Sequence, residues 1–104
     1  MVLRELAQML VHELRDPRLH GVSLTRVRMT DDLRHGRVYF SHLEGRPHAA
    51  AAVKGFHSAA GFIRHKVGRE LGLRFAPVLD FEYDSSAERA ARIDLLLRES
   101  RAKG

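Results

Sequence analysis

An apolar stripe with the spacing of a helix face runs through the middle of this sequence and keeps its phase across a glycine. Its members step by three or four residues: Ala49, Val53, Phe56, Ala60, Ile63, Val67 and Leu71. A loop between two separate helices would normally reset this register, so the stripe predicts one long helix over residues 48–72. A straight helix of that length would extend roughly 37 Å, at about 1.5 Å per residue. A compact chain of about 100 residues is only about 33 Å across. We therefore predict a kink at Ala59 and Gly61, with Gly61 as the permissive position.

The composition is that of a single globular domain with an anionic partner. The chain has 104 residues, of which 44% are hydrophobic and 30% charged, and its net charge is +5. An excess of cations favours a polyanion, most commonly nucleic acid for a protein of this size. No apolar run approaches the ~20 residues of a membrane span, and the N-terminus lacks a signal-peptide pattern. We expect a cytoplasmic protein that does not bind a membrane. The absence of cysteine excludes disulfides and thiolate metal sites.

Two kinds of periodicity precede the bent helix. A narrow apolar stripe over residues 3–14 predicts an amphipathic helix that ends at Asp16-Pro17. This helix starts almost at Met1 without a capping residue, so we expect that upstream residues are missing. Alternating residues around 27–29 and 38–40 then predict a β-hairpin. Val22 and Leu24 are out of phase with the first strand, which predicts a late start or a β-bulge.

A strand and a last helix follow the bent helix. Gly72 is placed to end the long helix, and residues 79–83 alternate as a strand with one solvated face. Pro77 should lie at the edge of the sheet or outside its ladder. The sequence from Ser85 to Glu88 matches a capping box, which predicts a helix start. The apolar residues of this last helix do not share one face, so it rests weakly on the domain or packs against a partner: Ile93, Leu95, Leu96 and Leu97. The element order predicts an α+β two-layer domain.

Cations gather beside the predicted kink. On the second half of the long helix, polar and basic residues lie opposite or beside the apolar stripe, and a further arginine follows the helix: Arg64, His65, Lys66, Arg69 and Arg74. They carry more than half of the net charge of the chain, which is typical of a surface that follows RNA phosphates. The alternative is an ordinary solvated helix face. A second basic group surrounds the hairpin, partly offset by Asp31 and Asp32: Arg26, Arg28, Arg34 and Arg37. Tyr39 could stack on a base, although packing on the sheet explains it as well.

The sequence gives little support to an enzyme or a metalloprotein. The seven histidines form no HxxxH or HxH pair, so we expect no metal site and no cofactor. Asp80, Glu82 and Asp84 share one strand face and superficially resemble a magnesium cluster, but charge on the solvent side of an edge strand explains them better. A nuclease built on these carboxylates is the enzymatic alternative. No phosphate-binding glycine loop and no nucleophile-and-base arrangement is present.

The order and spacing of several short motifs resemble the ribosome-binding factor A family along nearly the whole chain. They are Asp16-Pro17-Arg18-Leu19, Val27-x-Met29-Thr30-x-Asp32-Leu33, Val38-Tyr39-Phe40, Ala59-Ala60-Gly61-Phe62-Ile63-Arg64, Leu73-Arg74-x-x-Pro77-x-Leu79-x-Phe81, Asp84-x-Ser86 and Arg92-Ile93. The resemblance implies a KH-like domain of type II order (α-β-β-α-kink-α-β) over residues 1–84 and a C-terminal helical tail over residues 85–104. An Ala-x-Gly kink at Ala59 and Gly61 stands where other KH domains have a GxxG loop, so the usual clamp on four nucleotides does not transfer.

The resemblance also implies a function. It implies a bacterial assembly factor, not an enzyme, that binds the immature small ribosomal subunit and its rRNA. Such a protein assists late maturation and 5′-end processing of that rRNA and is associated with growth in the cold. We expect no small-molecule substrate and a monomer when free. The alternative is a general KH-like RNA-binding protein or RNA chaperone that is not specific to ribosomes. The family's basic residues before the first helix are absent here and the tail is short, so contacts by these segments are not implied.

Overall fold

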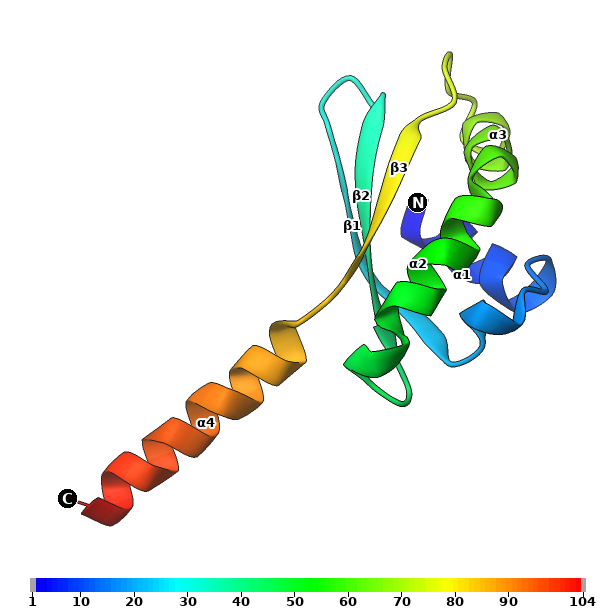
Figure 1. Cartoon of the computed structure of the whole chain (residues 1–104). Helices are drawn as coiled ribbons and strands as arrows, with labels where there is room; N and C mark the ends of the chain where they lie inside the picture. The colour runs from blue at the N-terminus through cyan, green and yellow to red at the C-terminus, as the bar shows by residue number, and fades with distance from the viewer. Residues whose placement is uncertain (1, 104) are drawn as a thin grey trace.

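The protein is an α+β domain with a helix that projects from it. The computed structural model describes residues 2–103, apart from the side chains of residues 2, 3, 5, 10, 11, 102 and 103. Three helices pack on one face of a three-stranded sheet, and the C-terminal helix points away from this body (Figure 1). The elements in chain order are α1 (Val2–His12), the 3₁₀ turn η1 (Pro17–Leu19), β1 (Val22–Met29), β2 (His35–His42), the 3₁₀ turn η2 (Arg46–His48), α2 (Ala49–Ser58), α3 (Ala60–Glu70), β3 (Val78–Tyr83) and α4 (Ser86–Lys103).

The sheet is mixed and has the strand order β1-β2-β3. β1 and β2 form the predicted antiparallel hairpin, and β3 lies parallel to β2. The register shifts between Leu24 and Arg26, which confirms the predicted bulge. It returns Val27 to the side of the sheet that faces the helices, where Leu24 also packs. Pro77 precedes the first paired residue of the edge strand, as predicted. The two-layer α+β fold class is therefore confirmed.

The long apolar stripe belongs to two helices with a break between them, as predicted. The backbone leaves helical geometry at Ala59, where φ is −96° and ψ is 2°. The Ala59 carbonyl already accepts the Ile63 N–H at 2.9 Å, so α3 starts at once and the stripe keeps its phase. Gly61 lies in the first turn of α3, and a Cβ added there would meet nothing within 4 Å. The break therefore lies at Ala59, the first of the two residues named for the kink, and Gly61 lies inside α3.

The end of α3 is fixed by a glycine in the left-handed region. Gly72 has φ +64°, a conformation that L side chains rarely adopt. The N–H of Leu73 donates to the Gly68 carbonyl at 2.8 Å, and the N–H of Gly72 donates to the Arg69 carbonyl at 3.2 Å. These two bonds form a Schellman motif, so Gly72 ends the helix as the sequence predicts.

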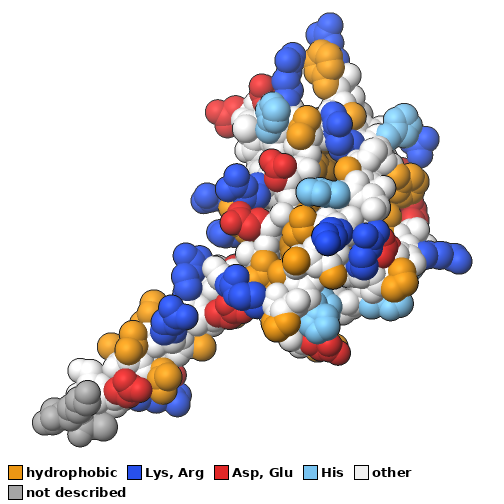
Figure 2. Space-filling view, viewed as in Figure 1, with side chains coloured by type: hydrophobic (Ala, Val, Ile, Leu, Met, Phe, Trp, Pro, Cys, Tyr) orange, Lys and Arg blue, Asp and Glu red, His pale blue; other side chains and the backbone are white. Residues whose placement is uncertain are grey.

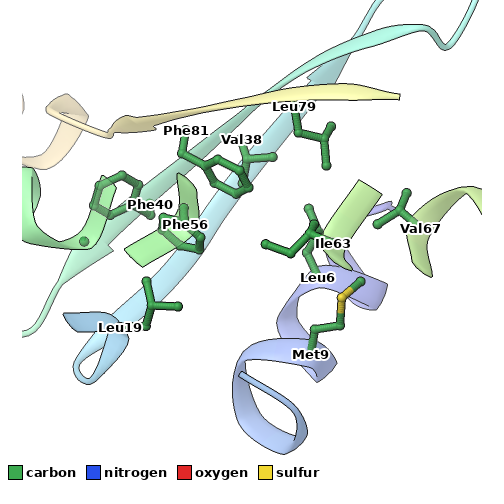
Figure 3. Close-up of a cluster of buried hydrophobic side chains, with 11 residues drawn as sticks. Leu6, Met9, Leu19, Val38, Phe40, Phe56, Ile63, Val67, Leu79 and Phe81 are labelled. Carbon is green, nitrogen blue, oxygen red and sulfur yellow. The ribbon is translucent and has the colours of Figure 1, made fainter. Parts of the chain in front are cut away.

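The core lies between the sheet and α2 and α3, with α1 closing one side (Figure 3). Phe56 of α2 is 1% exposed and stacks on Phe81 of β3, with 4.1 Å between the ring centroids. The ring of Phe40 on β2 also packs on Phe56, with 5.4 Å between the ring centroids. Ile63 and Val67 extend the core along α3 and are equally buried. The apolar residues of α2 and of α3 therefore belong to one core, although the helix is broken at Ala59.

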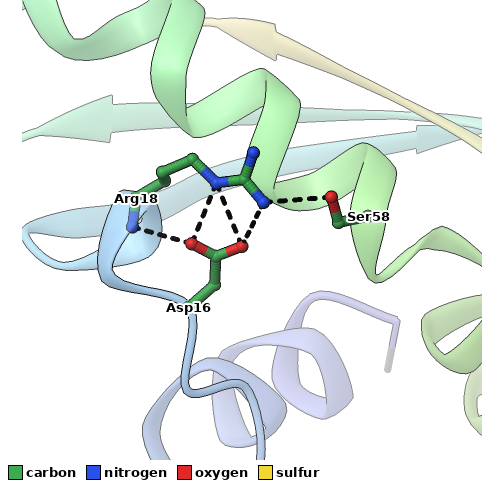
Figure 4. Close-up of polar contacts among 3 residues, drawn as sticks. All are labelled: Asp16, Arg18 and Ser58. Atoms are coloured by element: carbon green, nitrogen blue, oxygen red, sulfur yellow. Dashed lines mark hydrogen bonds and ion pairs between the residues drawn. The ribbon is translucent and has the colours of Figure 1, made fainter.

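The first helix ends earlier than predicted. α1 ends at His12, four residues before Asp16. The Asp16-Pro17 pair instead begins η1, where the Asp16 carboxylate accepts the Arg18 N–H at 2.9 Å and binds the Arg18 guanidinium (Figure 4). Hydrogen bonds from Arg18 lower the pKa of Asp16 to about 2. The same guanidinium donates to Ser58 at the end of α2, next to the helix break.

The predicted capping box at the start of α4 is wrong. Glu88 does not reach back to the helix N-terminus, because its carboxylate binds Arg46 at 2.7 Å and accepts from the Tyr83 hydroxyl at 3.1 Å. Asp84 takes the capping role, since its carboxylate accepts the Ser86 N–H at 2.9 Å and the Thr25 hydroxyl at 2.6 Å. A residue before the helix thus supplies the cap and also ties it to β1.

Asparagine at Asp84 should make the protein less stable and less sensitive to acid. Hydrogen bonds from Ser86 and Thr25 lower the pKa of Asp84 from 3.8 to about 2. This depressed pKa stabilises the fold above about pH 4, and the contribution is lost as the pH falls toward 2. We expect Asp84→Asn to lower Tm by about 5 °C at neutral pH. Its Tm should fall less than the native one between about pH 4 and pH 2. Asp80→Asn, at an exposed carboxylate of the same strand, is the control, and equal losses in both variants would contradict this role.

α4 exposes apolar side chains along its length. Ile93, Leu95, Leu96 and Leu97 are each more than half exposed, and the helix projects from the body in Figure 1. The extents of 58 × 33 × 18 Å reflect this projection. The division of the chain into residues 1–84 and 85–104 stays a prediction. Among the described residues, no helix combines the length and hydrophobicity needed to cross a membrane.

Candidate nucleic-acid interface

The cations predicted on α3 fall into two sets, and the first set serves the tertiary structure. The Arg64 side chain is partly buried, and its Nε donates to the Pro77 carbonyl at 2.9 Å, just before β3 begins. The Lys66 ammonium pairs with the Glu13 carboxylate, and the Lys66 side chain is only 21% exposed. These two contacts connect α3 to β3 and to the segment after α1. An RNA phosphate would have to compete with them for both cations.

The second set is open to solvent. His65, Arg69 and Arg74 are exposed, and within the described part of the chain no hydrogen bond or ion pair engages their side chains. His65 and Arg69 line one side of a hollow of about 230 Å³ at the end of α3, which Leu73 and Ala76 close. Arg74 follows just after Gly72. The exposed arginines of the α3 group, Arg69 and Arg74, therefore lie at the C-terminal end of α3 and in the loop that follows.

The basic residues of the hairpin lie on a different surface. Arg26, Arg28, Arg37 and Tyr39 alternate with side chains that face the helices, so they lie on the opposite face of the sheet. The Arg26 guanidinium covers the Tyr39 ring at 4.1 Å and lies 3.9 Å from Asp84. Arg37 pairs with Glu82 across the parallel strands at 3.7 Å. Arg28 is exposed. Arg26, Arg28 and Arg37 therefore lie on a different face from the α3 cations, whereas Arg34 of the same group lies near Arg74.

The carboxylates of β3 do not gather into a metal site. Asp80 and Glu82 are exposed on the outer face of the sheet, as expected for an edge strand. Asp84 differs from that expectation because it is bound to Thr25 and Ser86. Over the part of the chain that the structure describes, no group of three or more metal-ligating side chains is close enough to hold an ion.

The structure adds Phe75 to the candidate site and brings Arg34 of the hairpin group beside it. The α3–β3 loop carries Phe75, which is 51% exposed, and the tip of the hairpin brings Arg34 over its ring at 4.5 Å. Arg74 lies on the same ring at 5.8 Å. Figure 2 shows basic side chains beside a hydrophobic one at the apex of the molecule, where Figure 1 has this loop. The signal in the sequence was an aromatic residue next to an arginine, between Gly72 and Pro77.

Comparison with known proteins places this geometry in one family. The model of the family "Ribosome-binding factor A" matches residues 1–97. The ribosome-binding factor A of Acetivibrio thermocellus is 42% identical over 103 residues, which cover 98% of this chain and 84% of that protein.

Solved structures agree with the fold. The solution structure of a Thermotoga maritima protein described as a ribosome binding factor A has a TM-score of 0.68 and 32% identity, and the match covers 83% of this chain and 86% of that one. The ribosome binding factor A of Thermus thermophilus, as fitted into a cryo-EM map of a 30S complex, has a TM-score of 0.59. It is 22% identical, and the match covers 82% of this chain and 93% of that one. At this identity the likeness concerns the fold.

Proposed function

The chain belongs to the ribosome-binding factor A family, and we infer from this that it is a bacterial assembly factor that binds the immature small ribosomal subunit. The observation that carries the inference is the family match over residues 1–97, together with the 42% identity to a curated member. The family consists of assembly factors that are not enzymes, so binding takes the place of catalysis. The proposed action is cytoplasmic and assists late maturation of the rRNA, including processing at its 5′ end.

The proposed mechanism is a preference for one conformation of the subunit. A protein that binds one arrangement of the rRNA better than another shifts the population toward it by its difference in affinity. Arg69 and Arg74 carry the phosphate contacts in this proposal, because their side chains are exposed where Arg64 and Lys66 are engaged. The cations on the outer face of the sheet, Arg26, Arg28 and Arg37, offer a second and separate contact.

Co-sedimentation with small subunits tests this function. We expect the protein to sediment with immature small subunits and to remain with them when unrelated RNA is added in excess. Mature subunits should retain much less of it. The bound fraction should fall as salt is raised, since each phosphate contact lowers the logarithm of affinity by about 0.7 per logarithmic unit of salt on single strands.

The same experiment separates the alternatives. A general RNA chaperone would leave the subunits for the unrelated RNA, and equal binding to both kinds of subunit would contradict a maturation factor. Magnesium-dependent cleavage of precursor rRNA by the pure protein, abolished by Glu82→Gln, would contradict the proposal that it acts by binding.

A further inference from the structure

An exposed aromatic ring lies near two guanidinium groups at the apex of the domain, at the end away from α4 (Figure 1). Phe75 belongs to the loop between α3 and β3, and half of its surface is open to solvent. Arg34 belongs to the loop between β1 and β2, and its guanidinium carbon lies 4.5 Å from the centroid of the Phe75 ring. Arg74 lies 5.8 Å from the same ring centroid. Phe75 is not among the described residues that form the hydrophobic core.

The two loops that form this arrangement hold each other in place. The N–H of Val78 donates to the Arg34 carbonyl at 2.8 Å, which fastens the start of β3 to the tip of the hairpin. Within the hairpin, the Asp32 carboxylate accepts the Arg34 N–H at 3.0 Å and the Thr30 hydroxyl at 2.7 Å. These bonds lower the pKa of Asp32 and occupy the one carboxylate of the site. Arg34 and Phe75 are therefore presented from anchored backbone.

The ring borders a hollow that continues toward the exposed cations of α3. This hollow of about 180 Å³ is lined by residues of both loops: Asp32, Leu33, Arg34, Gly72, Leu73, Arg74 and Phe75. Leu73 also lines the neighbouring hollow that contains His65 and Arg69. A strand of RNA that lies along these two hollows would pass Arg69 and Arg74 with its phosphates before one of its bases reaches Phe75.

We propose that Phe75 is a stacking platform for one unpaired base of single-stranded RNA, with Arg34 and Arg74 binding the phosphates on either side of that base. Aromatic side chains next to arginines are the usual means of binding unstacked bases, because every base offers a π-face. The stacked base takes the place of the Arg34 guanidinium on the ring, and this guanidinium then binds a phosphate. The inference rests on the proposed function for the identity of the RNA, which is rRNA of the small subunit.

The chain contains no tryptophan, so a single replacement makes this site visible by fluorescence. We expect emission of Phe75→Trp to be quenched when an oligouridylate of about ten nucleotides binds, because a stacked base quenches an indole directly. An abasic strand of the same length keeps the phosphates and should leave the emission unchanged. The matched control is Leu43→Trp, which places the indole at an exposed position in the loop after β2. Quenching that is equal at both positions, or equal with the abasic strand, would overturn the proposal.

Affinity for immature small subunits supplies a second and independent readout. Loss of one stacked base corresponds to about a tenfold weaker affinity, which we expect for Phe75→Leu. Phe75→Tyr keeps the ring and should bind like the native protein. Because Phe75 is half exposed, all three side chains are compatible with the fold, and an unchanged Tm verifies this.

The outcomes separate this proposal from the proposed function. Native protein that ignores immature subunits would contradict the function, whatever the oligouridylate shows. Native affinity of Phe75→Leu for the subunits would overturn the stacking proposal and leave the function intact. If Phe75→Leu weakens binding to subunits but Phe75→Trp shows no quenching that depends on bases, the ring contacts a ribosomal protein, and the proposal fails.

Discussion

Alanine at Phe56 is expected to lower the free energy of unfolding by about 3–5 kcal/mol. The ring is 1% exposed, stacks on Phe81 and meets Phe40, so its removal empties the place where α2 joins the sheet. Single domains have a total stability of only about 5–15 kcal/mol. Urea unfolding followed by circular dichroism measures the change, and the midpoint should fall without a change in slope.

Two variants show whether packing is the cause. Phe56→Leu keeps most of the buried apolar volume and should lose less than half as much stability as Phe56→Ala. Phe62→Ala removes a ring of the same size that is 50% exposed on α3, six residues further along. If Phe62→Ala destabilised the protein as much as Phe56→Ala, the core described here would be wrong.

The secondary structure was predictable because its periodicities are long. The stripe through α2 and α3 covers more than six turns, and a pattern of that length leaves few alternatives. The predicted kink named two residues, Ala59 and Gly61, and the break lies at the first of them. Alanine has no local preference for a kink, so the spacing of the apolar residues does not tell which of the two positions leaves helical geometry. Gly61 was chosen for its permissive backbone, which the structure does not use.

The candidate site was less predictable, because the spacing of residues along a helix does not show which other segments of the chain pack against it. The helical spacing puts Arg64 on the flank of the apolar stripe and Lys66 opposite it, but the partners of both residues are distant in sequence. The Lys66 partner Glu13 is 53 residues away, and Arg64 reaches a backbone carbonyl 13 residues further on. Arg34 was named with the hairpin cations, but its contact with Phe75 was not predictable, because the two residues come together only where two loops meet.

Glutamate at both Arg69 and Arg74 is expected to weaken binding to immature small subunits by roughly 25-fold or more at about 0.1 M salt. Each phosphate contact adds about 0.7 to the exponent with which affinity falls as the salt concentration rises. Two lost contacts change this exponent by about 1.4, which is a factor of about 25 in affinity at 0.1 M salt if the affinities are equal at 1 M salt. Repulsion between the new carboxylates and phosphates adds to the loss. Both arginines are exposed, and no ion pair holds either within the described residues, so the fold should remain intact.

The control must change the net charge equally without touching the site. Arg4→Glu with Lys54→Glu does so at exposed positions on α1 and α2. It should lose little affinity, because only cations that contact phosphates release counterions at the contact. The logarithmic salt slope should become shallower by about 1.4 in the Arg69 and Arg74 variant and stay nearly native in the control. Equal losses in both variants would mean that net charge alone draws the protein to the subunit. The end of α3 would then not be the docking surface, and the separate cations on the outer face of the sheet would be the next to test.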